Sequence, residues 1–332
     1  MKQVCVLGAG TWGIALAQAL AGDGHRVVVW SALPREIDNL SATHRHPYLP
    51  DVTLHDTIRY ESNIADAIAG SDLVLFAVPS IYLRSTAEQA KPYIPVGQLI
   101  VSVVKGIESE TLMTMTEVIA DVLGDDIPGV RIVALSGPTH AEEVAAGLPT
   151  AIVAACEDLA AAREVQNIFM SLQFRVYVNG DARGVQLCGA LKNVIALASG
   201  IAHGMGFGDN TRAAIITRGM AEMSRLGTAM GCAPETFFGL AGIGDLVVTC
   251  MSMHSRNNSC GMMIGQGVPL DEALSRVGMV VEGVNTLPAA LLLAEKYHVE
   301  LPIISMVDRV LYHGLSPRAA VDALMGRAKK AE

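Results

Sequence analysis

Lys192 is the residue whose type and surroundings most strongly suggest chemistry. Histidines apart, it is the only charged residue between Arg183 and Asp209. The segment is apolar on nearly every side of the expected helix, so we expect that helix to be buried. A lysine in such a place either reaches the surface with its side chain or is kept for a purpose. In the second case, desolvation lowers the pKa towards the working range of a general acid or base.

Further along the chain, two polar groups could act with a buried lysine. Asp245 lies in the glycine-rich stretch Gly239–Leu246 and could approach such a lysine. Ser255, Arg256 and Asn257 offer a guanidinium beside hydroxyl and amide donors, which suits a phosphate. Ser and Asn are also common helix caps. Taken alone, these residues therefore slightly favour an exposed loop that leads into a capped helix over a phosphate site.

Two further polar groups follow apolar runs in the first half of the chain. Lys105 follows the run Leu99–Val104, and Ser136-Gly137-Pro138-Thr139 follows the run Arg131–Leu135. Open α/β sheets bind ligands at the carboxyl ends of their strands, so both groups are candidate ligand contacts. A solvated loop lysine and an ordinary turn explain the same residues equally simply.

The stretch Gly8-Ala9-Gly10-Thr11-Trp12-Gly13 has the spacing G-x-G-x-x-G. It follows an expected strand and opens an expected helix, which is the context that makes the motif informative. In a dinucleotide site Gly8 would allow the tight turn, Gly10 the approach of the pyrophosphate and Gly13 the close packing of helix on strand. The alternative is a plain strand-to-helix turn.

Cofactor preference depends on the residue at the end of the second strand, where an acid favours NAD and a nearby arginine accommodates the 2′-phosphate of NADP. The chain has Ser31-Ala32-Leu33 at this point, and Arg35 comes a few residues later. This stretch does not decide between NADP and NAD, although Arg35 slightly favours NADP.

The elements that must position these residues change in character along the chain. Short Val/Ile/Leu runs alternate with helical patterns up to about residue 180, which predicts a doubly wound α/β sheet of Rossmann type whose strands are buried on both faces. The expected strands are Val4–Leu7, Arg26–Trp30, Leu73–Val78, Leu99–Val104, Arg131–Leu135, Thr150–Ala155 and Phe174–Val178. The expected helices between them are Gly13–Ala21, Ile81–Ala90, Leu112–Leu123 and Leu159–Met170.

From Asp181 onward, helical patterns replace the strand-like runs, and Asn179-Gly180-Asp181 reads as a turn and a helix start. We therefore predict a dinucleotide-binding domain over residues 1–180 and an all-α domain over 181–332 that carries the catalytic and substrate residues. Its expected helices are Ala182–Ala202, Asn210–Met230, Pro234–Phe238, Asp271–Arg276, Leu287–Tyr297, Ile303–Tyr312 and Pro317–Met325.

Composition excludes several classes of protein. The net charge of −9 argues against a nucleic-acid binder, which would carry a basic stripe. The mean hydropathy is +0.38, but no run of about 18 apolar residues lacks polar breaks, so we expect no membrane span. We expect no secretory signal and no metal site. The six cysteines form no C-x-x-C pair, which is typical of reduced thiols in a cytoplasmic protein.

Together the quoted stretches, with Gly189-Ala190-Leu191-Lys192-Asn193 and Val281-Glu282-Gly283, resemble the bacterial type of NAD(P)-dependent glycerol-3-phosphate dehydrogenase over nearly the whole chain. The resemblance implies reversible hydride transfer between NAD(P)H and dihydroxyacetone phosphate, giving sn-glycerol 3-phosphate for glycerophospholipid synthesis. It also implies a helical C-terminal domain like that of 6-phosphogluconate dehydrogenase, and a homodimer.

The resemblance also implies roles for individual residues. Lys192 would donate and accept the proton, and Lys105 and Asp245 would orient the substrate and polarise its carbonyl. The implied substrate contacts are Lys105, Gly137, Thr139, Lys192, Asp245, Ser255, Arg256 and Asn257. The implied cofactor contacts are Gly8, Gly10, Thr11, Trp12, Gly13, Lys105, Ala141, Arg256, Val280 and Glu282.

Two other functions stay open at this stage. A β-hydroxyacid dehydrogenase also pairs a dinucleotide fold with a helical domain and a lysine. Its substrate carries a carboxylate in place of the phosphate of dihydroxyacetone phosphate. A non-catalytic NAD(P)-sensing protein would keep Gly8, Gly10 and Gly13 without needing Lys192, Asp245 and Arg256.

Overall fold

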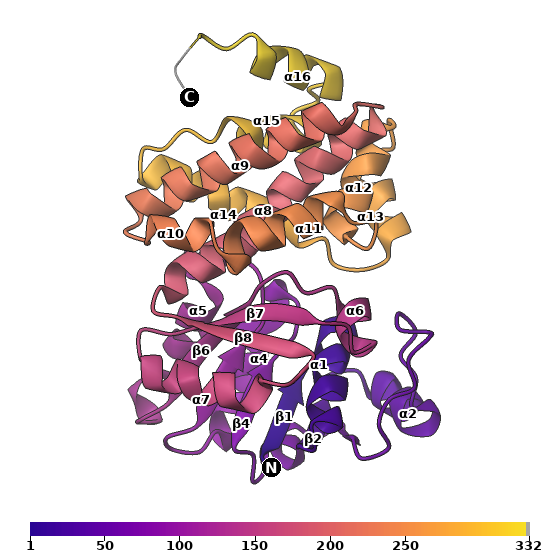
Figure 1. The fold of residues 1–332 in the computed structure, drawn as a ribbon, viewed down its shortest axis with the longest axis vertical. Helices are drawn as coiled ribbons and strands as arrows, with labels where there is room; N and C mark the ends of the chain where they lie inside the picture. Colours follow the sequence, from indigo (N-terminus) through magenta and orange to yellow (C-terminus); the bar gives the residue numbers. More distant parts are fainter. Residues whose placement is uncertain (330–332) are drawn as a thin grey trace. The chain divides into compact units, whose positions relative to one another are not determined.

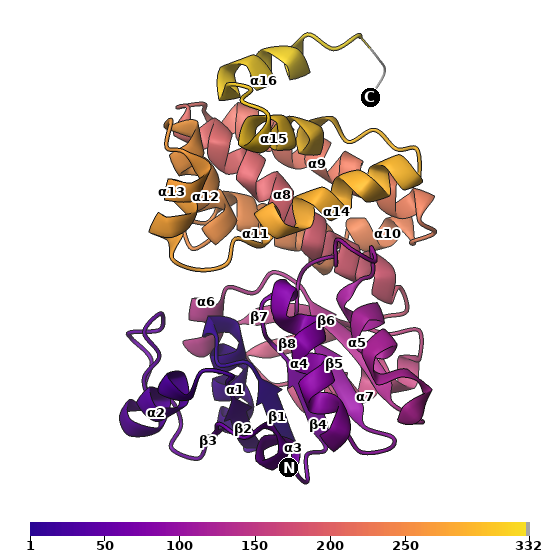
Figure 2. The ribbon, with the colours of Figure 1, turned by 180° about the vertical axis from the view of Figure 1, so that it is seen from behind.

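The computed structural model describes residues 1–329, and the chain divides into two compact units (Figures 1 and 2). The first unit comprises Met1–Lys105 and Met113–Gln186. The second comprises Gly106–Leu112 and the chain from Leu187 onward. The boundary predicted at Asp181 marks the start of a helix, whereas the units divide after Gln186, within that helix. The assignment of one function to each domain remains a prediction.

The first unit is built on an eight-stranded sheet with the order β3-β2-β1-β4-β5-β6-β7-β8. All neighbouring strands run parallel except β6 and β7, which pair antiparallel, while β7 and β8 are parallel to each other. The strands are β1 (Gln3–Leu7), β2 (Arg26–Trp30), β3 (Arg59–Glu61), β4 (Leu73–Phe76), β5 (Leu99–Ser102), β6 (Arg131–Ser136), β7 (Thr150–Ala155) and β8 (Phe174–Asn179).

Helices cover both faces of this sheet, so the predicted doubly wound fold is confirmed. Figure 1 shows α1 and α7 on one face, and Figure 2 shows α3, α4 and α5 on the other. The helices of the first unit are α1 (Thr11–Gly22), α2 (Pro34–Thr43), α3 (Ile64–Ile68), α4 (Leu83–Ala90), α5 (Met115–Leu123), α6 (Ala141–Ala145) and α7 (Leu159–Phe169).

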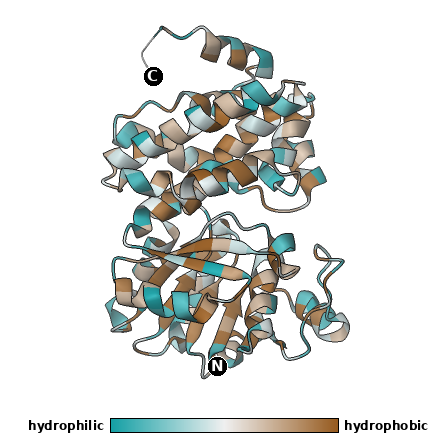
Figure 3. Cartoon of the chain, viewed as in Figure 1, coloured by the Kyte–Doolittle hydropathy of each residue, from teal (hydrophilic) through white to brown (hydrophobic). Residues whose placement is uncertain are grey.

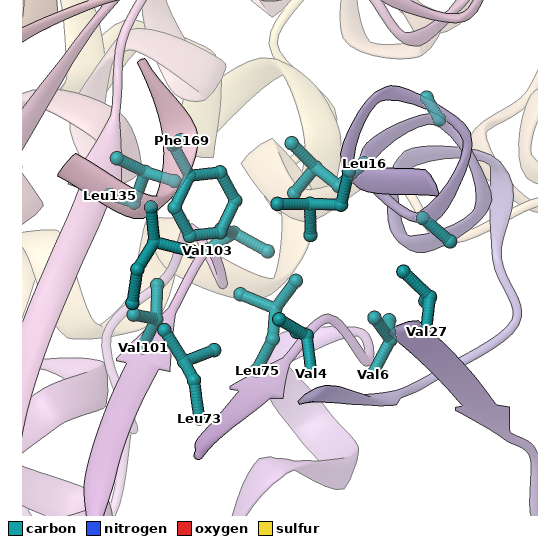
Figure 4. Close-up of a cluster of buried hydrophobic side chains, with 14 of the residues drawn as sticks. Val4, Val6, Leu16, Val27, Leu73, Leu75, Val101, Val103, Leu135 and Phe169 are labelled. Atoms are coloured by element: carbon teal, nitrogen blue, oxygen red, sulfur yellow. The ribbon is translucent and has the colours of Figure 1, made fainter. Parts of the chain in front are cut away.

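The alternation of side chains along β1 shows why its apolar residues are continuous. Val4 and Val6 belong to the core cluster under α1 and α7, which Figure 4 shows in close-up, while Cys5 and Leu7 belong to the cluster on the opposite face. Successive strand residues point to opposite faces. A strand covered by helices on both faces must therefore be apolar throughout.

Several details of the first unit differ from the prediction. The strand β3 was missed because Arg59-Tyr60-Glu61 is a short polar segment at the edge of the sheet. The predicted helix Leu112–Leu123 begins later, as α5, because Leu112 has φ +61° and Thr114 forms a capping box with Glu117. The helices α2, α3 and α6, the last two of them a single turn or little more, also went unpredicted.

The second unit is helical, as predicted. Asp181 caps its first long helix by accepting a hydrogen bond from the Gly184 N–H at 2.9 Å. Its helices are α8 (Ala182–Gly204), α9 (Asp209–Ala229), α10 (Pro234–Phe237), α11 (Asp245–Met251), α12 (Arg256–Gly265), α13 (Leu270–Val277), α14 (Glu282–Lys296), α15 (Pro302–Tyr312) and α16 (Pro317–Met325).

Helix α8 forms the centre of this unit and is hydrophobic along most of its length (Figure 3). By length and composition it could cross a membrane, but its apolar window is entirely buried inside the fold. The helices 234–251 and 256–265 would also pass that test as a pair with a 48° bend. Core helices of soluble proteins pass the same test, so α8 gives no support to a membrane span.

Four glycines bring α12 against α8 at backbone distance. A Cβ on Gly200 would lie 2.1 Å from the Asn258 carbonyl oxygen, and one on Gly204 would lie 2.0 Å from that of Met262. From the other side, added Cβ atoms on Gly261 and Gly265 would meet the α8 backbone at 2.3 and 2.1 Å. This contact holds the first turn of α12 close to α8.

We predict that Gly200→Ala lowers the free energy of unfolding by about 1–3 kcal/mol, because the two backbones must separate to admit the methyl group. Gly22→Ala is the matched control, since its added Cβ would approach only the tip of His55, at 3.4 Å. Urea denaturation of both variants measures the difference. Equal losses in the two variants would contradict the close backbone contact.

A second prediction concerns Glu222, which is 3% exposed on α9 and accepts hydrogen bonds from the Ile303 and Ile304 N–H groups that begin α15. Burial raises its pKa from 4.5 to about 7, although the two N–H groups and the charges of Arg225 and Arg327 act in the opposite direction. The folded state thus holds a proton that the unfolded chain releases above pH 4.5. The stability contributed by this group is complete below pH 4.5 and is lost as pH rises towards 7.

Glu222→Gln imitates the protonated form at every pH. Relative to this variant, the wild type should lose about 1–3 kcal/mol of unfolding free energy between pH 4.5 and 7.5. Denaturant unfolding across this range tests it, with the exposed Glu235→Gln as the control. Parallel pH profiles for wild type and Glu222→Gln would refute the role of this carboxyl.

Candidate active site

The side chain of Lys192 is buried in the second unit, and its ammonium group contacts two polar side chains there. The residue is 5% exposed, and Cys188, Leu191 and Ile195 around it on α8 are completely buried. Its Nζ contacts Asp245 Oδ1 in a buried ion pair and donates to Thr249 Oγ1 at 2.7 Å. The side chain therefore does not reach the surface, and a catalytic purpose for this lysine remains a prediction.

Asp245 and Thr249 reach Lys192 from one face of α11, one helical turn apart. Thr249 Oγ1 also donates to the Asp245 carbonyl oxygen at 2.6 Å. The preceding stretch Leu240–Gly244 is a wide helical turn that starts close to α10, where a Cβ on Gly242 would lie 2.0 Å from the Phe237 carbonyl oxygen. The glycine at this position thus allows the close backbone contact with α10, and the turn places Asp245 beside Lys192.

A chain of amide groups ties α12 and α14 to α8 beside the lysine. Asn257 Nδ2 donates to Asn193 Oδ1 at 3.0 Å, and the Gly283 N–H donates to Asn257 Oδ1 at 2.8 Å. A Cβ on Gly283 would lie 2.5 Å from the Asn193 carbonyl oxygen, so this contact also requires glycine. Asn193, the residue after Lys192, therefore helps to hold α12 and α14 in place beside the lysine.

The residues Ser255, Arg256 and Asn257 form the cap and the start of helix α12, whose extent was not predicted. Ser255 Oγ accepts from the Asn258 N–H at 3.2 Å and caps the helix. The exposed loop and the capped helix that the sequence slightly favoured are both present, because Met253 and His254 before the cap are exposed. Ser255 and Asn257, by contrast, are buried. The exposed Arg256 stands at the first helical position, where free N–H groups also favour an anion.

In the first unit, the glycine turn has the shape that a pyrophosphate needs. Gly8 has φ +126°, and an added Cβ would lie 2.7 Å from the Ala77 carbonyl oxygen; one on Gly13 would lie 2.2 Å from that of Gly8. Gly10, by contrast, has open space around the position of a Cβ. Thr11 and Trp12 are half-buried at the start of α1. These features fit a dinucleotide held at the N-terminus of α1.

The structure brings Lys105, Gly137 and Thr139 together at the ends of β5 and β6. Lys105 Nζ donates to the Gly137 carbonyl oxygen at 3.1 Å, and Thr139 Oγ1 donates to the same oxygen at 3.2 Å. Lys105 is thus not a freely solvated loop lysine. The adjacent Ser136 hydroxyl is buried and has no hydrogen-bond partner among residues 1–329. A ligand could use it.

The remaining predicted cofactor residues mark the starts of two helices. Ala141 is the first residue of α6, and Glu282 is the first residue of α14, two positions after Val280. Sequence reasoning missed Thr249, and it quoted Asn193 and Ser136 only within longer motifs, without giving either a role of its own. The spacing of Thr249 four residues after Asp245 would have indicated a shared helix face, had α11 been recognised.

The chain is similar over its full length to known enzymes. Family profiles described as the N-terminus and C-terminus of NAD-dependent glycerol-3-phosphate dehydrogenase match residues 3–162 and 181–322. A glycerol-3-phosphate dehydrogenase [NAD(P)+] of Lactobacillus delbrueckii subsp. bulgaricus is 58% identical over 334 aligned residues, which cover 100% of this chain and 99% of that one. The corresponding enzyme of Agathobacter rectalis is 50% identical and covers 100% of this chain and 98% of its own.

A solved structure gives the same result. The crystal structure of the Coxiella burnetii glycerol-3-phosphate dehydrogenase superposes with a TM-score of 0.93 at 37% identity, covering 98% of this chain and 99% of that chain. The match includes both the dinucleotide fold and the helical part with Lys192, Asp245 and Arg256. The family profiles and the relative that is 58% identical argue against the two alternatives, a carboxylate-specific dehydrogenase and a non-catalytic NAD(P)-sensing protein.

Proposed function

Because the chain belongs to the NAD-dependent glycerol-3-phosphate dehydrogenase family, we propose that Lys192 transfers the proton in the reaction of this NAD(P)-dependent oxidoreductase. The reaction interconverts dihydroxyacetone phosphate, NAD(P)H and a proton with sn-glycerol 3-phosphate and NAD(P)+. The single observation that carries the proposal is the buried ammonium group held by Asp245 and Thr249 in an apolar helix.

The cofactor, when bound, supplies or accepts the hydride at the substrate's carbonyl carbon. Lys192 Nζ would donate a proton to the carbonyl oxygen during reduction and take it back from the hydroxyl during oxidation. Asp245 compensates the ammonium charge and orients it, while Thr249 fixes a second hydrogen-bonding direction. Such fixed partners reduce the reorganisation needed as charge develops on the substrate's oxygen.

For substrate binding, we propose the start of α12 as the phosphate contact. The guanidinium of Arg256 offers bidentate geometry, and the N-terminal end of the helix favours negative charge. Ser255 and Asn257 hold this turn through the hydrogen bonds to Asn258 and Asn193. Lys105, Gly137 and Thr139 are proposed as further substrate contacts of the first unit, because they form a polar cluster at strand ends.

The proposed cofactor site centres on the glycine turn. Gly8 and Gly13 shape the turn, and Gly10, Thr11 and Trp12 would face the dinucleotide at the start of α1. We retain Lys105, Ala141, Arg256, Val280 and Glu282 as additional cofactor contacts, on the family resemblance. The finer expectations are that the protein is cytoplasmic, forms a homodimer, binds no nucleic acid and supplies glycerol 3-phosphate for glycerophospholipids.

We predict that Lys192→Ala lowers kcat by at least about 100-fold while leaving the dissociation constant of the dinucleotide nearly unchanged. Because the substitution leaves the buried Asp245 charge uncompensated, it should also destabilise the fold by about 3–5 kcal/mol. The measurement therefore includes Lys192→Met with Asp245→Asn, which restores charge balance, and rescue of Lys192→Ala by small amines. Near-wild-type kcat in Lys192→Ala would disprove the assignment.

We predict that Arg256→Ala raises the KM for dihydroxyacetone phosphate, because it removes a charge-assisted contact worth about 1.5–3 kcal/mol, or about 10–100-fold. Arg256 is exposed, so thermal unfolding should be unchanged. The control is Arg276→Ala, an exposed arginine on α13 that pairs with Glu272. If the two variants show the same KM as the wild type, the start of α12 does not bind the phosphate.

A further inference from the structure

The end of strand β2 carries an anchored carboxylate that the sequence did not reveal. Ser31, the residue after β2, is 5% exposed. Its hydroxyl donates to Glu36 Oε2 at 2.6 Å and accepts from the Leu33 N–H at 3.1 Å. Glu36 lies in the first turn of α2, where the free N–H groups of the helix also favour a negative charge. The carboxylate is thus fixed over the end of the strand.

This carboxylate stands beside the glycine turn. The carbonyl oxygen of Trp30, the last residue of β2, accepts a hydrogen bond from the Gly8 N–H at 2.9 Å. In α/β dinucleotide folds, the group at the end of the second strand contacts the adenosine ribose, and an acid there accepts from the ribose hydroxyls. Here the acid comes from the following helix, and Ser31 places it. Glu36 Oε2 is used by Ser31, which leaves Oε1 for a ribose hydroxyl.

The imidazole next to this carboxylate is buried, which disfavours its charged form. His46 is 8% exposed, hydrogen-bonds the Ala9 backbone, and accepts from the Tyr48 N–H at Nδ1. Burial lowers its pKa below 6.5, although the Ala9 bond and the charge of Glu36 act in the opposite direction. Burial thus disfavours a positive charge on this ring, which makes it a poor partner for a 2′-phosphate.

The arginines of this region are less well placed than Glu36. Arg59 pairs with Glu61 on β3 at 2.7 Å, and Arg45 donates to the Pro50 carbonyl oxygen at 3.2 Å. Arg35 is exposed beside Glu36 on α2. Glu36 is exposed too, but the hydrogen bond from Ser31 holds its carboxylate in place. The anchored acid therefore outweighs the arginine on which the sequence-based inclination towards NADP relied.

We propose that Glu36, positioned by Ser31, binds the adenosine ribose hydroxyls and makes this chain prefer NADH to NADPH. A 2′-phosphate would bring roughly two further negative charges against a fixed carboxylate. The preference rests on the proposed function, since it presupposes a dinucleotide on the glycine turn. Ser31 is a positioning residue, and Glu36 is the one that would contact the cofactor.

The test is the equilibrium dissociation constant of NADH and of NADPH, measured by fluorescence titration without substrate. The wild type should bind NADH at least about tenfold more tightly, a difference of about 1.4 kcal/mol. In Glu36→Gln this ratio should shrink by about five- to tenfold, mainly through tighter NADPH binding. Asp38→Asn, an exposed acid on the same helix, should keep the wild-type ratio and controls for net charge.

Ser31→Ala provides a second variant, which keeps the carboxylate but releases it, and it should reduce the ratio by less than Glu36→Gln does. Equal or reversed affinities in the wild type would overturn the preference. An unchanged ratio in a folded Glu36→Gln would also overturn it. Failure of the wild type to bind either dinucleotide would overturn the proposed function together with the preference.

Discussion

The ammonium charge of Lys192 is the constraint around which the helical unit is organised. A charge in an apolar helix core is costly unless it is paired and hydrogen-bonded. Asp245 and Thr249 satisfy it from α11, and they reach it because the chain before α11 follows a path that only glycine permits at Gly242. Helix α11 must therefore lie where Asp245 and Thr249 can contact the ammonium group, since this buried charge would otherwise be costly.

Close backbone contacts make the rest of this frame possible. The glycines on α8 and α12 bring Asn258 and Met262 against α8, and Gly283 does the same for α14 at Asn193. Because the helix backbones approach closely, the short amide side chains of Asn193 and Asn257 can bridge the helices directly. Because packed interiors deform little, the start of α12 is held in a definite position relative to Lys192. Geometry at a reacting atom depends on this kind of support.

The sequence predicted the parts whose signal is local. Apolar runs located β2 and β7 at their observed bounds, and the glycine spacing indicated the turn at Gly8. The strand β3 and the helices α11 and α12 escaped, because Arg59-Tyr60-Glu61 has no apolar period, and Asn257, Asn258 and Gly261 disfavour a helix in isolation. Tertiary contacts with α8 overrule that preference. Lys192 could be recognised because the residues next to it in the sequence are apolar. Its contact with Thr249 could not be predicted, because it depends on helix α11, which no local pattern indicated.

Net charge says little about which anions this chain binds. The formal charge is −9, yet the helix starts at Gly10 and Ser255 both present N–H groups that have no partner within the helix ladder, and these act over one turn of helix. Screening confines distant surface charge to about 8–10 Å at physiological salt, so the local groups decide. Local groups also decide at the end of β2, where the deciding charge is negative. There a single carboxylate, fixed by Ser31, carries more weight than the neighbouring arginine, because a hydrogen bond sets its position.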